Sequence, residues 1–137
     1  MKAIQTYLNF DGDTREAMTF YQKCLDAELF LQTFSDAKME APPGAEDRVI
    51  HARVQKGSAI VMASDTMPGT PYEQGNNFAV MVDCENTAEI EKLFAAFGVG
   101  GKVTMPLQDT FWGARFGMLT DRFGVAWMFN CDLPPKA

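Results

Sequence analysis

The chain has 137 residues, 47% of them hydrophobic and 12% aromatic, which is typical of one folded domain and not of a disordered protein. Its formal net charge of −6 and its scattered basic residues argue against nucleic acid or a membrane surface as the main partner. No apolar run approaches the roughly 20 residues of a membrane helix, and no signal peptide is recognisable, so we expect a cytoplasmic protein. The cysteines, Cys24, Cys84 and Cys131, are odd in number and lack motif spacing, which predicts reduced thiols.

The first half of the chain predicts a strand, a helix and two or three further strands. Residues 3–10 mix β-branched, aromatic and apolar side chains, as strands do. We expect a helix to begin at Asp13, because Glu16 follows three residues later in the spacing of a capping box. Its apolar face recurs at helical spacing at Ala17, Phe20, Tyr21 and Cys24. The following strands are expected at 28–35, 49–55 and 58–64, with an exposed loop over 36–47.

The same pattern begins again after a turn-rich segment, 68–75, which we interpret as the link between two halves. A strand is expected at 77–83. Asn86 and Glu89 then repeat the capping spacing at the start of a second helix. The apolar face of this helix is predicted at Ile90, Leu93, Phe94 and Phe97. The closing strands are expected at 102–105, 112–120 and 125–131.

The two halves align at one constant offset, which pairs Glu16 with Glu89 and Tyr21 with Phe94. A unit of one strand, one helix and three strands cannot cover its own sheet. The repeat therefore predicts an α+β fold of two βαβββ modules, about 1–66 and 76–132, within one domain spanning 1–137. We expect a curved mixed sheet with its helices outside and a concave face on which a ligand would bind.

Several short motifs resemble PhnB-like proteins, a group also described as 3-demethylubiquinone-9 3-methyltransferase-like. The N-terminal motifs are Phe10-Asp11-Gly12, Glu16-Ala17-Met18, Phe20-Tyr21, His51-Ala52 and Met62-Ala63-Ser64-Asp65. The C-terminal ones are Phe111-Trp112-Gly113, Arg115, Gly117, Asp121, Phe123-Gly124 and Trp127. These proteins belong to the glyoxalase, bleomycin-resistance and dioxygenase (vicinal oxygen chelate) superfamily. The resemblance implies the paired βαβββ fold and a homodimer, and it leaves the activity open.

Metal-dependent members of that superfamily place His, Glu or Gln ligands at four inward strand positions. Carried over by motif, these positions fall on Thr6, Met62, Asn77 and Met128. Thioethers and a hydroxyl do not bind hard or borderline divalent metals, and one amide cannot hold such an ion alone. We therefore expect no metal and no cofactor, and we assign these positions to the binding of a ligand.

Two residues are candidates for catalysis. Histidine side chains change charge near neutral pH, so His51 would serve as a general base or hydrogen-bond partner, or else as a structural histidine. Arg115 would bind a carboxylate or phosphate, or else form a salt bridge to Asp109 or Asp121. Trp112, beside Arg115, is a further candidate for ligand binding. Trp127 is expected in the core, because strand alternation places it opposite Met128.

Strand alternation also predicts the side chains of the concave face, which are mostly apolar and rich in methionine. They are Thr6, Leu8, Ile60, Met62, Ser64, Asn77, Ala79, Met81, Met128 and Asn130. Such a lining favours a metal-independent protein that binds a small, largely apolar molecule. Two alternatives stay open: an enzyme of unknown chemistry that uses His51 or Arg115, and a dimeric interaction module without a ligand.

Overall fold

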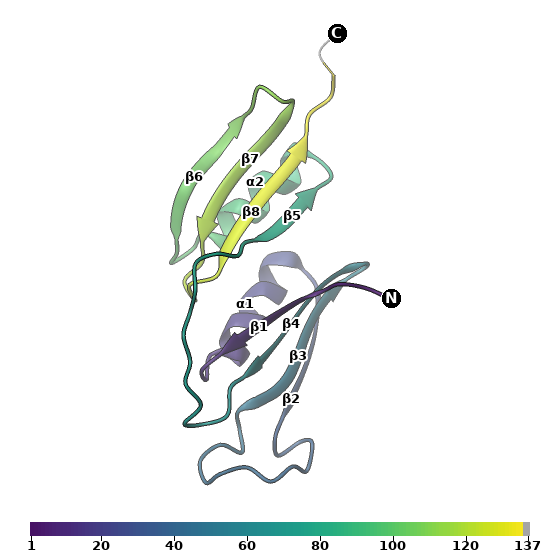
Figure 1. Cartoon of the computed structure of the whole chain (residues 1–137). Helices are drawn as coiled ribbons and strands as arrows, with labels where there is room; N and C mark the ends of the chain where they lie inside the picture. The colour runs from purple at the N-terminus through teal and green to yellow at the C-terminus, as the bar shows by residue number, and fades with distance from the viewer. Residues whose placement is uncertain (136–137) are drawn as a thin grey trace. The chain divides into compact units, whose positions relative to one another are not determined.

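The computed structural model describes residues 1–135, which fall into two compact units that divide between Glu73 and Gln74. Each unit runs in the order strand, helix and three strands, as Figure 1 shows along the chain. The α+β class and the repeated βαβββ order predicted from the sequence are confirmed. Hydrogen bonding groups the strands into two mixed sheets of four strands, one in each unit.

The first unit contains β1 and α1 followed by a three-stranded meander. Its elements are β1 (Thr6–Phe10), α1 (Thr14–Leu25), β2 (Glu28–Thr33), β3 (Val49–Lys56) and β4 (Ala59–Asp65). The strands lie in the order β1-β4-β3-β2, with β1 parallel to β4 and the other pairs antiparallel. The first strand begins at Thr6, three residues later than the composition of the segment indicates.

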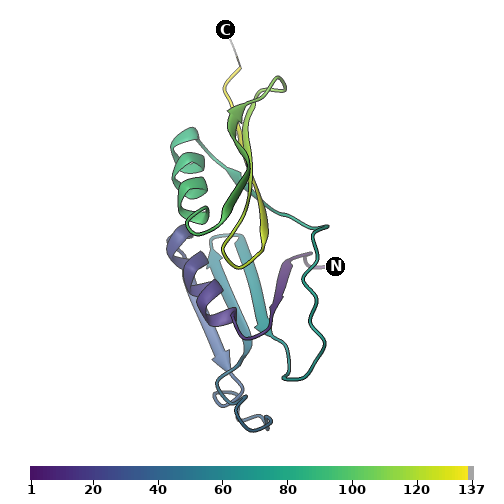
Figure 2. The same ribbon diagram turned by 90° about the vertical axis from the view of Figure 1, so that its left-hand side faces the viewer.

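Helix α1 covers one face of this sheet, as the view in Figure 2 shows. The helix side chains that point to the sheet are fully buried at Ala17, Met18 and Tyr21. They meet the alternate strand positions that are also buried, such as Val54 and Ala63. The opposite face of the sheet has no helix of its own unit upon it.

The second unit repeats this plan. Its elements are β5 (Val80–Cys84), α2 (Thr87–Phe97), β6 (Lys102–Asp109), β7 (Ala114–Thr120) and β8 (Ala126–Asp132), and its strand order is β5-β8-β7-β6. Three predicted boundaries are wrong, and one of them is the end of β6, which lies at Asp109 and not at Met105. The first strand begins at Val80 and not at Asn77, and Trp112 lies in the turn before β7, where Thr110 bonds back to Ala114.

The core of the second unit is aromatic. The α2 side chains Ile90 and Phe97 are fully buried, and the Phe97 ring lies 4.6 Å from the Trp127 ring between centroids. Trp127 is 1% exposed, so its predicted place in the core is confirmed. Burial of one such large side chain contributes on the order of 2–3 kcal/mol to folding.

The two helices begin differently. At α2 the Asn86 side chain accepts a hydrogen bond of 2.8 Å from the Glu89 amide, as the capping spacing predicts. At α1 the cap residue is Asp13, also as predicted, but its side chain makes no capping bond. None of the helices formed by residues 1–135 is long and apolar enough to cross a membrane.

Candidate functional site

Each sheet has an open face, turned away from the helix of its own unit. On the first sheet, paired register places Tyr7, Met62, Arg53 and Phe30 in one row across β1, β4, β3 and β2. Paired residues of neighbouring strands share one face of a sheet. We call these four residues, together with His51 beside them on β3, the first open face. Tyr7 and Phe30 are 43% and 46% exposed there, so two aromatic rings stand available to a ligand.

His51 sits at the centre of the first open face, between the two exposed rings. Its Nδ1 atom lies 3.1 Å from the Tyr7 hydroxyl oxygen, and the two rings are stacked with centroids 5.8 Å apart. The Phe30 ring lies 6.2 Å away on the other side. The structure thus joins residues 44 positions apart in sequence, and a pairing so distant leaves no local signal.

Arg53 adds a positive charge to the same face. Its guanidinium carbon lies 5.7 Å from the centroid of the Phe30 ring, within the range of a cation–π contact. Such a contact at an exposed site is worth roughly 0.5–1 kcal/mol and holds the long side chain against the sheet. The first open face therefore combines aromatic surface, one thioether, one imidazole and one guanidinium.

The corresponding row of the second sheet consists entirely of methionines. Paired register places Met81, Met128, Met118 and Met105 across β5, β8, β7 and β6. We call these four residues, with the neighbouring Phe116, the second open face. Met81 is 50% exposed and the other three methionines are half-buried. Methionine is flexible and polarizable, so such a row adapts its shape to an apolar partner.

Some of the predicted ligand-binding residues lie on the open faces of the sheets, and others do not. Met62 and Met128 lie on the open faces as expected, at matching positions of the two sheets. The placement of Thr6 on the open face is wrong, because Thr6 pairs with buried Val61 and so points to the helix side. The same error affects Leu8, which pairs with buried Ala63.

Asn77 and Trp112 both lie outside the strands. Asn77 is in the exposed segment before β5, outside the paired strands. Strand pairing therefore does not place Asn77 on the open face. Trp112 is 60% exposed in the β6–β7 turn, with its ring 6.3 Å from that of Phe116. It therefore borders the second open face without belonging to its strands.

The side chain of Arg115 forms ion pairs within the second unit. Its strand partner is Cys131, which is buried on the helix side of the second sheet. Arg115 therefore lies on the helix side and not on the open face. Its guanidinium donates to Asp109 at 2.8 Å and to Glu91 of α2 at 2.8 Å. The expected salt bridge to Asp109 is confirmed, while Asp121 instead accepts bonds within the β7–β8 turn. The hydrogen bond that Arg115 donates to Asp109 raises the pKa of Arg115, so the guanidinium stays charged.

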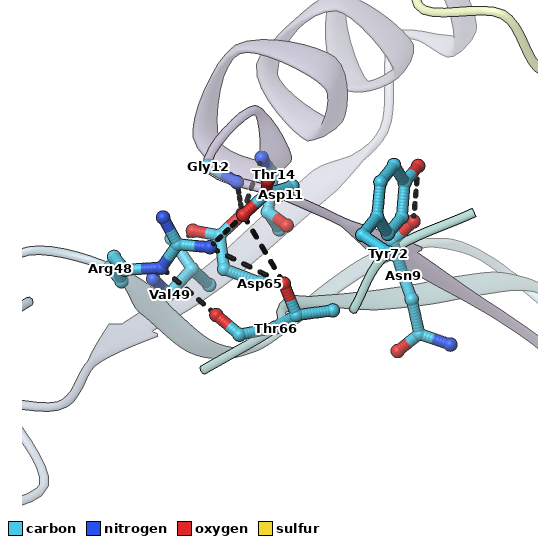
Figure 3. A network of polar contacts seen from close by, with 9 residues as sticks. All are labelled: Asn9, Asp11, Gly12, Thr14, Arg48, Val49, Asp65, Thr66 and Tyr72. Carbon is cyan, nitrogen blue, oxygen red and sulfur yellow. Dashed lines mark hydrogen bonds and ion pairs between the residues drawn. The ribbon is translucent and has the colours of Figure 1, made fainter. Parts of the chain in front are cut away.

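A buried carboxylate that sequence reasoning missed organises the end of β4. Figure 3 shows Asp65 accepting from the amides of Gly12 and Thr14 through Oδ1, at 3.0 and 3.1 Å. Its Oδ2 accepts from the Val49 amide at 2.9 Å. The carboxylate is thus used to hold the start of α1 and the start of β3. The available signal was parity, because Asp65 continues the buried alternation of Val61 and Ala63.

The same network continues to the surface (Figure 3). Arg48 donates to Asp11 at 2.7 Å and to the Thr66 carbonyl oxygen at 2.9 Å. The Tyr72 hydroxyl donates to the Asn9 carbonyl oxygen at 3.2 Å, which fastens the linking segment to β1. Burial raises the pKa of Tyr72, so the hydroxyl keeps its proton for this bond. The Arg48 contacts join loops to one another and the Tyr72 contact joins a loop to β1, so we assign the network to the fold and not to ligand chemistry.

The donor atoms in the central rows of the open faces do not suit a divalent metal, and His51 is the one imidazole beside them. At the matching central positions stand a phenol, Tyr7, and three thioethers, Met62, Met81 and Met128. Hard and borderline cations take carboxylate, imidazole or thiolate ligands in preference to these groups. Among residues 1–135 no group of three or more His, Cys, Asp or Glu side chains is placed to hold a metal ion.

Comparison with known proteins agrees with this architecture. The model of the Glyoxalase/Bleomycin resistance protein/Dioxygenase superfamily matches residues 3–129. The protein YjdN of Escherichia coli K12 is 32% identical over 138 residues, which covers 93% of each chain. The crystal structure of PA1353 from Pseudomonas aeruginosa superposes with a TM-score of 0.83 at 40% identity, over 96% of this chain and 100% of that one. The PhnB protein from Bacillus cereus gives 0.78 at 30% identity, over 95% and 99%.

Proposed function

The chain belongs to the glyoxalase/bleomycin resistance protein/dioxygenase superfamily, and on that premise we propose that it is a metal-independent member that binds a small, largely apolar molecule. The open sheet faces are the proposed binding surfaces. The observation that carries the proposal is the pair of matching rows, Tyr7-Met62-Arg53-Phe30 and Met81-Met128-Met118-Met105.

Both rows suit a planar, apolar ligand. Exposed aromatic rings on the first open face offer stacking surfaces, and thioethers on the second can follow the outline of a ring system. Contiguous exposed apolar side chains are uncommon on a protein surface that has no partner. The donor set of the same rows, which offers no ligand for a hard cation, supports independence from a divalent metal.

Thermal unfolding tests this proposal with a panel of fused-ring compounds such as quinoline, indole and 2-naphthol. A ligand present at one hundred times its Kd stabilises the folded state by about 2.7 kcal/mol. This corresponds to a rise in Tm of several degrees for a domain of this size. The rise should be unchanged by EDTA. Absence of stabilisation by the whole panel, or a stoichiometric divalent metal in the purified protein, would contradict the proposal.

A second candidate function is catalysis by His51, and the observation that favours it is the hydrogen bond between His51 and Tyr7. A histidine oriented by a neighbouring hydroxyl is a suitable general base for a ligand stacked on the same face. The Bacillus cereus relative is named for a suggested 3-demethylubiquinone-9 3-methyltransferase activity, and a quinol ring is planar and carries hydroxyl protons. Arg115 is left out of this candidate because Asp109 and Glu91 engage its guanidinium.

Mass spectrometry separates this second candidate from simple binding. Incubation with demethylated quinol and S-adenosylmethionine should yield a methylated product if His51 acts as a base. His51→Gln should then abolish turnover while the Tm shift given by the quinol persists. Turnover that survives in His51→Gln removes His51 from the chemistry.

We also propose that the protein forms a homodimer, as the family resemblance implies. Exposed aromatic residues of the second unit support this part of the proposal. Phe78 is 84% exposed and Phe111 is 97% exposed. The rings of Phe111 and Trp112 meet edge to face, with their centroids 5.0 Å apart. Light scattering on the purified chain should give twice the mass of one chain, and a monomer would refute this part.

A further inference from the structure

We propose that the ligand of the first open face is an aromatic carboxylate, whose acid group is bound by Arg53 and His51. This inference rests on the proposed function, and it names the chemical class that this face would select. It follows from the charge and the hydrogen-bonding capacity of the residues in the row, which differ from those of the second open face.

Arg53 is held on the surface without a carboxylate of its own. Arg48 pairs with Asp11, and Arg115 pairs with two acidic residues, whereas no acidic side chain among residues 1–135 lies within ion-pair distance of Arg53. Its guanidinium lies over the Phe30 ring, and the residue is exposed. A guanidinium offers only donors, in a fork that matches the two oxygens of a carboxylate.

His51 supplies a second donor to the same place. When the Tyr7 hydroxyl donates to Nδ1, the proton of the neutral imidazole is on Nε2, which is then a donor for a carboxylate. His51 and Arg53 are alternate residues of β3, so they stand about 7 Å apart along one face. Two charge-assisted hydrogen bonds of about 2.8 Å to one carboxylate can bridge that gap.

The surrounding residues direct the acid group and the ring to defined positions. Both His51 and Arg53 flank the ring of Phe30, so a planar ligand that binds them can stack on Phe30 or Tyr7. Glu28 lies on the same face, opposite Gln55, and repels a carboxylate toward the His51 end. On the second sheet Asn130 donates to Asp83 at 2.9 Å, and this acidic side chain disfavours an anion there.

Calorimetric titration with 2-naphthoate and with its neutral amide, 2-naphthamide, tests this assignment. We expect 2-naphthoate to bind at least about tenfold more tightly, because it forms charge-assisted bonds that the amide lacks. In Arg53→Gln the affinity for 2-naphthoate should fall about tenfold or more, to that of the amide, and Arg53→Lys should restore part of it. His51→Gln should weaken the carboxylate in the same direction.

Arg122→Gln is the matched control, because Arg122 also lies over a phenylalanine ring, 4.9 Å from that of Phe123, in the second unit. It should leave both affinities unchanged. Equal affinities for the acid and the amide, or equal losses in Arg53→Gln and Arg122→Gln, overturn the carboxylate assignment and leave apolar binding intact. If the wild type binds neither compound, the carboxylate assignment is refuted, and the proposed function is refuted as well only if the fused-ring panel also gives no stabilisation. The Tm of each variant establishes that it is folded.

Discussion

The two halves of the chain share one plan of strands and helices but present different chemistry on their open faces. At matching register positions the first half carries Tyr7 and Arg53, where the second carries Met81 and Met118. Both halves have a methionine at the central position of the row, Met62 in the first and Met128 in the second. The repeat has therefore kept the central thioether and changed its neighbours, which makes the first face polar and aromatic and the second adaptable and apolar.

The halves also differ in how their turns are stabilised. At the end of β4 stands Asp65, whose carboxylate accepts backbone bonds, whereas the register match at the end of β8 is Cys131. The second half places its buried acid elsewhere, at Asp121, which accepts from the Val125 amide and from the Trp127 indole N–H at 3.0 and 2.8 Å. One architecture thus tolerates two different arrangements of buried charge, each tied to its own loops.

Replacement of these matched residues should produce the largest difference between the halves. Asp65→Ala leaves the amides of Gly12, Thr14 and Val49 without their acceptor, and we expect a loss of about 3 kcal/mol or more in unfolding free energy. Cys131→Ala removes one buried atom and should cost about 1 kcal/mol. Urea denaturation measures both, and equal losses would show that Asp65 does not carry this role.

Sequence reasoning predicted the elements well, because capping residues, helical spacing and strand composition are local signals. It failed where a feature depends on register. The family motif and strand parity both place Thr6 on the wrong face, because neither shows that Tyr7, and not Thr6, pairs with Met62. The partners of His51 and of Asp65 lie in distant segments, so neither set of contacts could be read from spacing, although parity indicates that Asp65 is buried.

The helix caps offer a smaller contrast between the halves. Asn86→Ala removes the bond to the Glu89 amide and should cost about 1 kcal/mol of unfolding free energy. Asp13→Ala should cost only about 0.3–0.5 kcal/mol, from the lost charge near the helix N-terminus, because the Asp13 side chain makes no capping bond. A larger loss from Asp13→Ala than from Asn86→Ala in the same urea titration would contradict this account of the caps.

The thiols should differ in reactivity without any large effect on stability. No disulfide joins the cysteines within residues 1–135, as their number predicted. Burial, with the negative charge of Glu89, raises the pKa of Cys84 to about 12, so this thiol stays protonated and unreactive at pH 8. Iodoacetamide should then label Cys24, which is partly exposed, well before Cys84. Mass spectrometry of the native protein checks the order, and labelling of Cys84 first would contradict it.

The most direct test of ligand binding on the open faces uses methionines labelled with carbon-13 at the methyl group. Addition of quinoline to the protein in EDTA should shift the NMR signals of Met62, Met81 and Met128, and addition of 2-naphthoate should shift that of Met62. Met18, fully buried under the helix side of the first sheet, is the internal control and should not move. Shifts confined to Met18, or to the exposed loop residues Met39 and Met67, would contradict the proposal that the open faces form the binding surface.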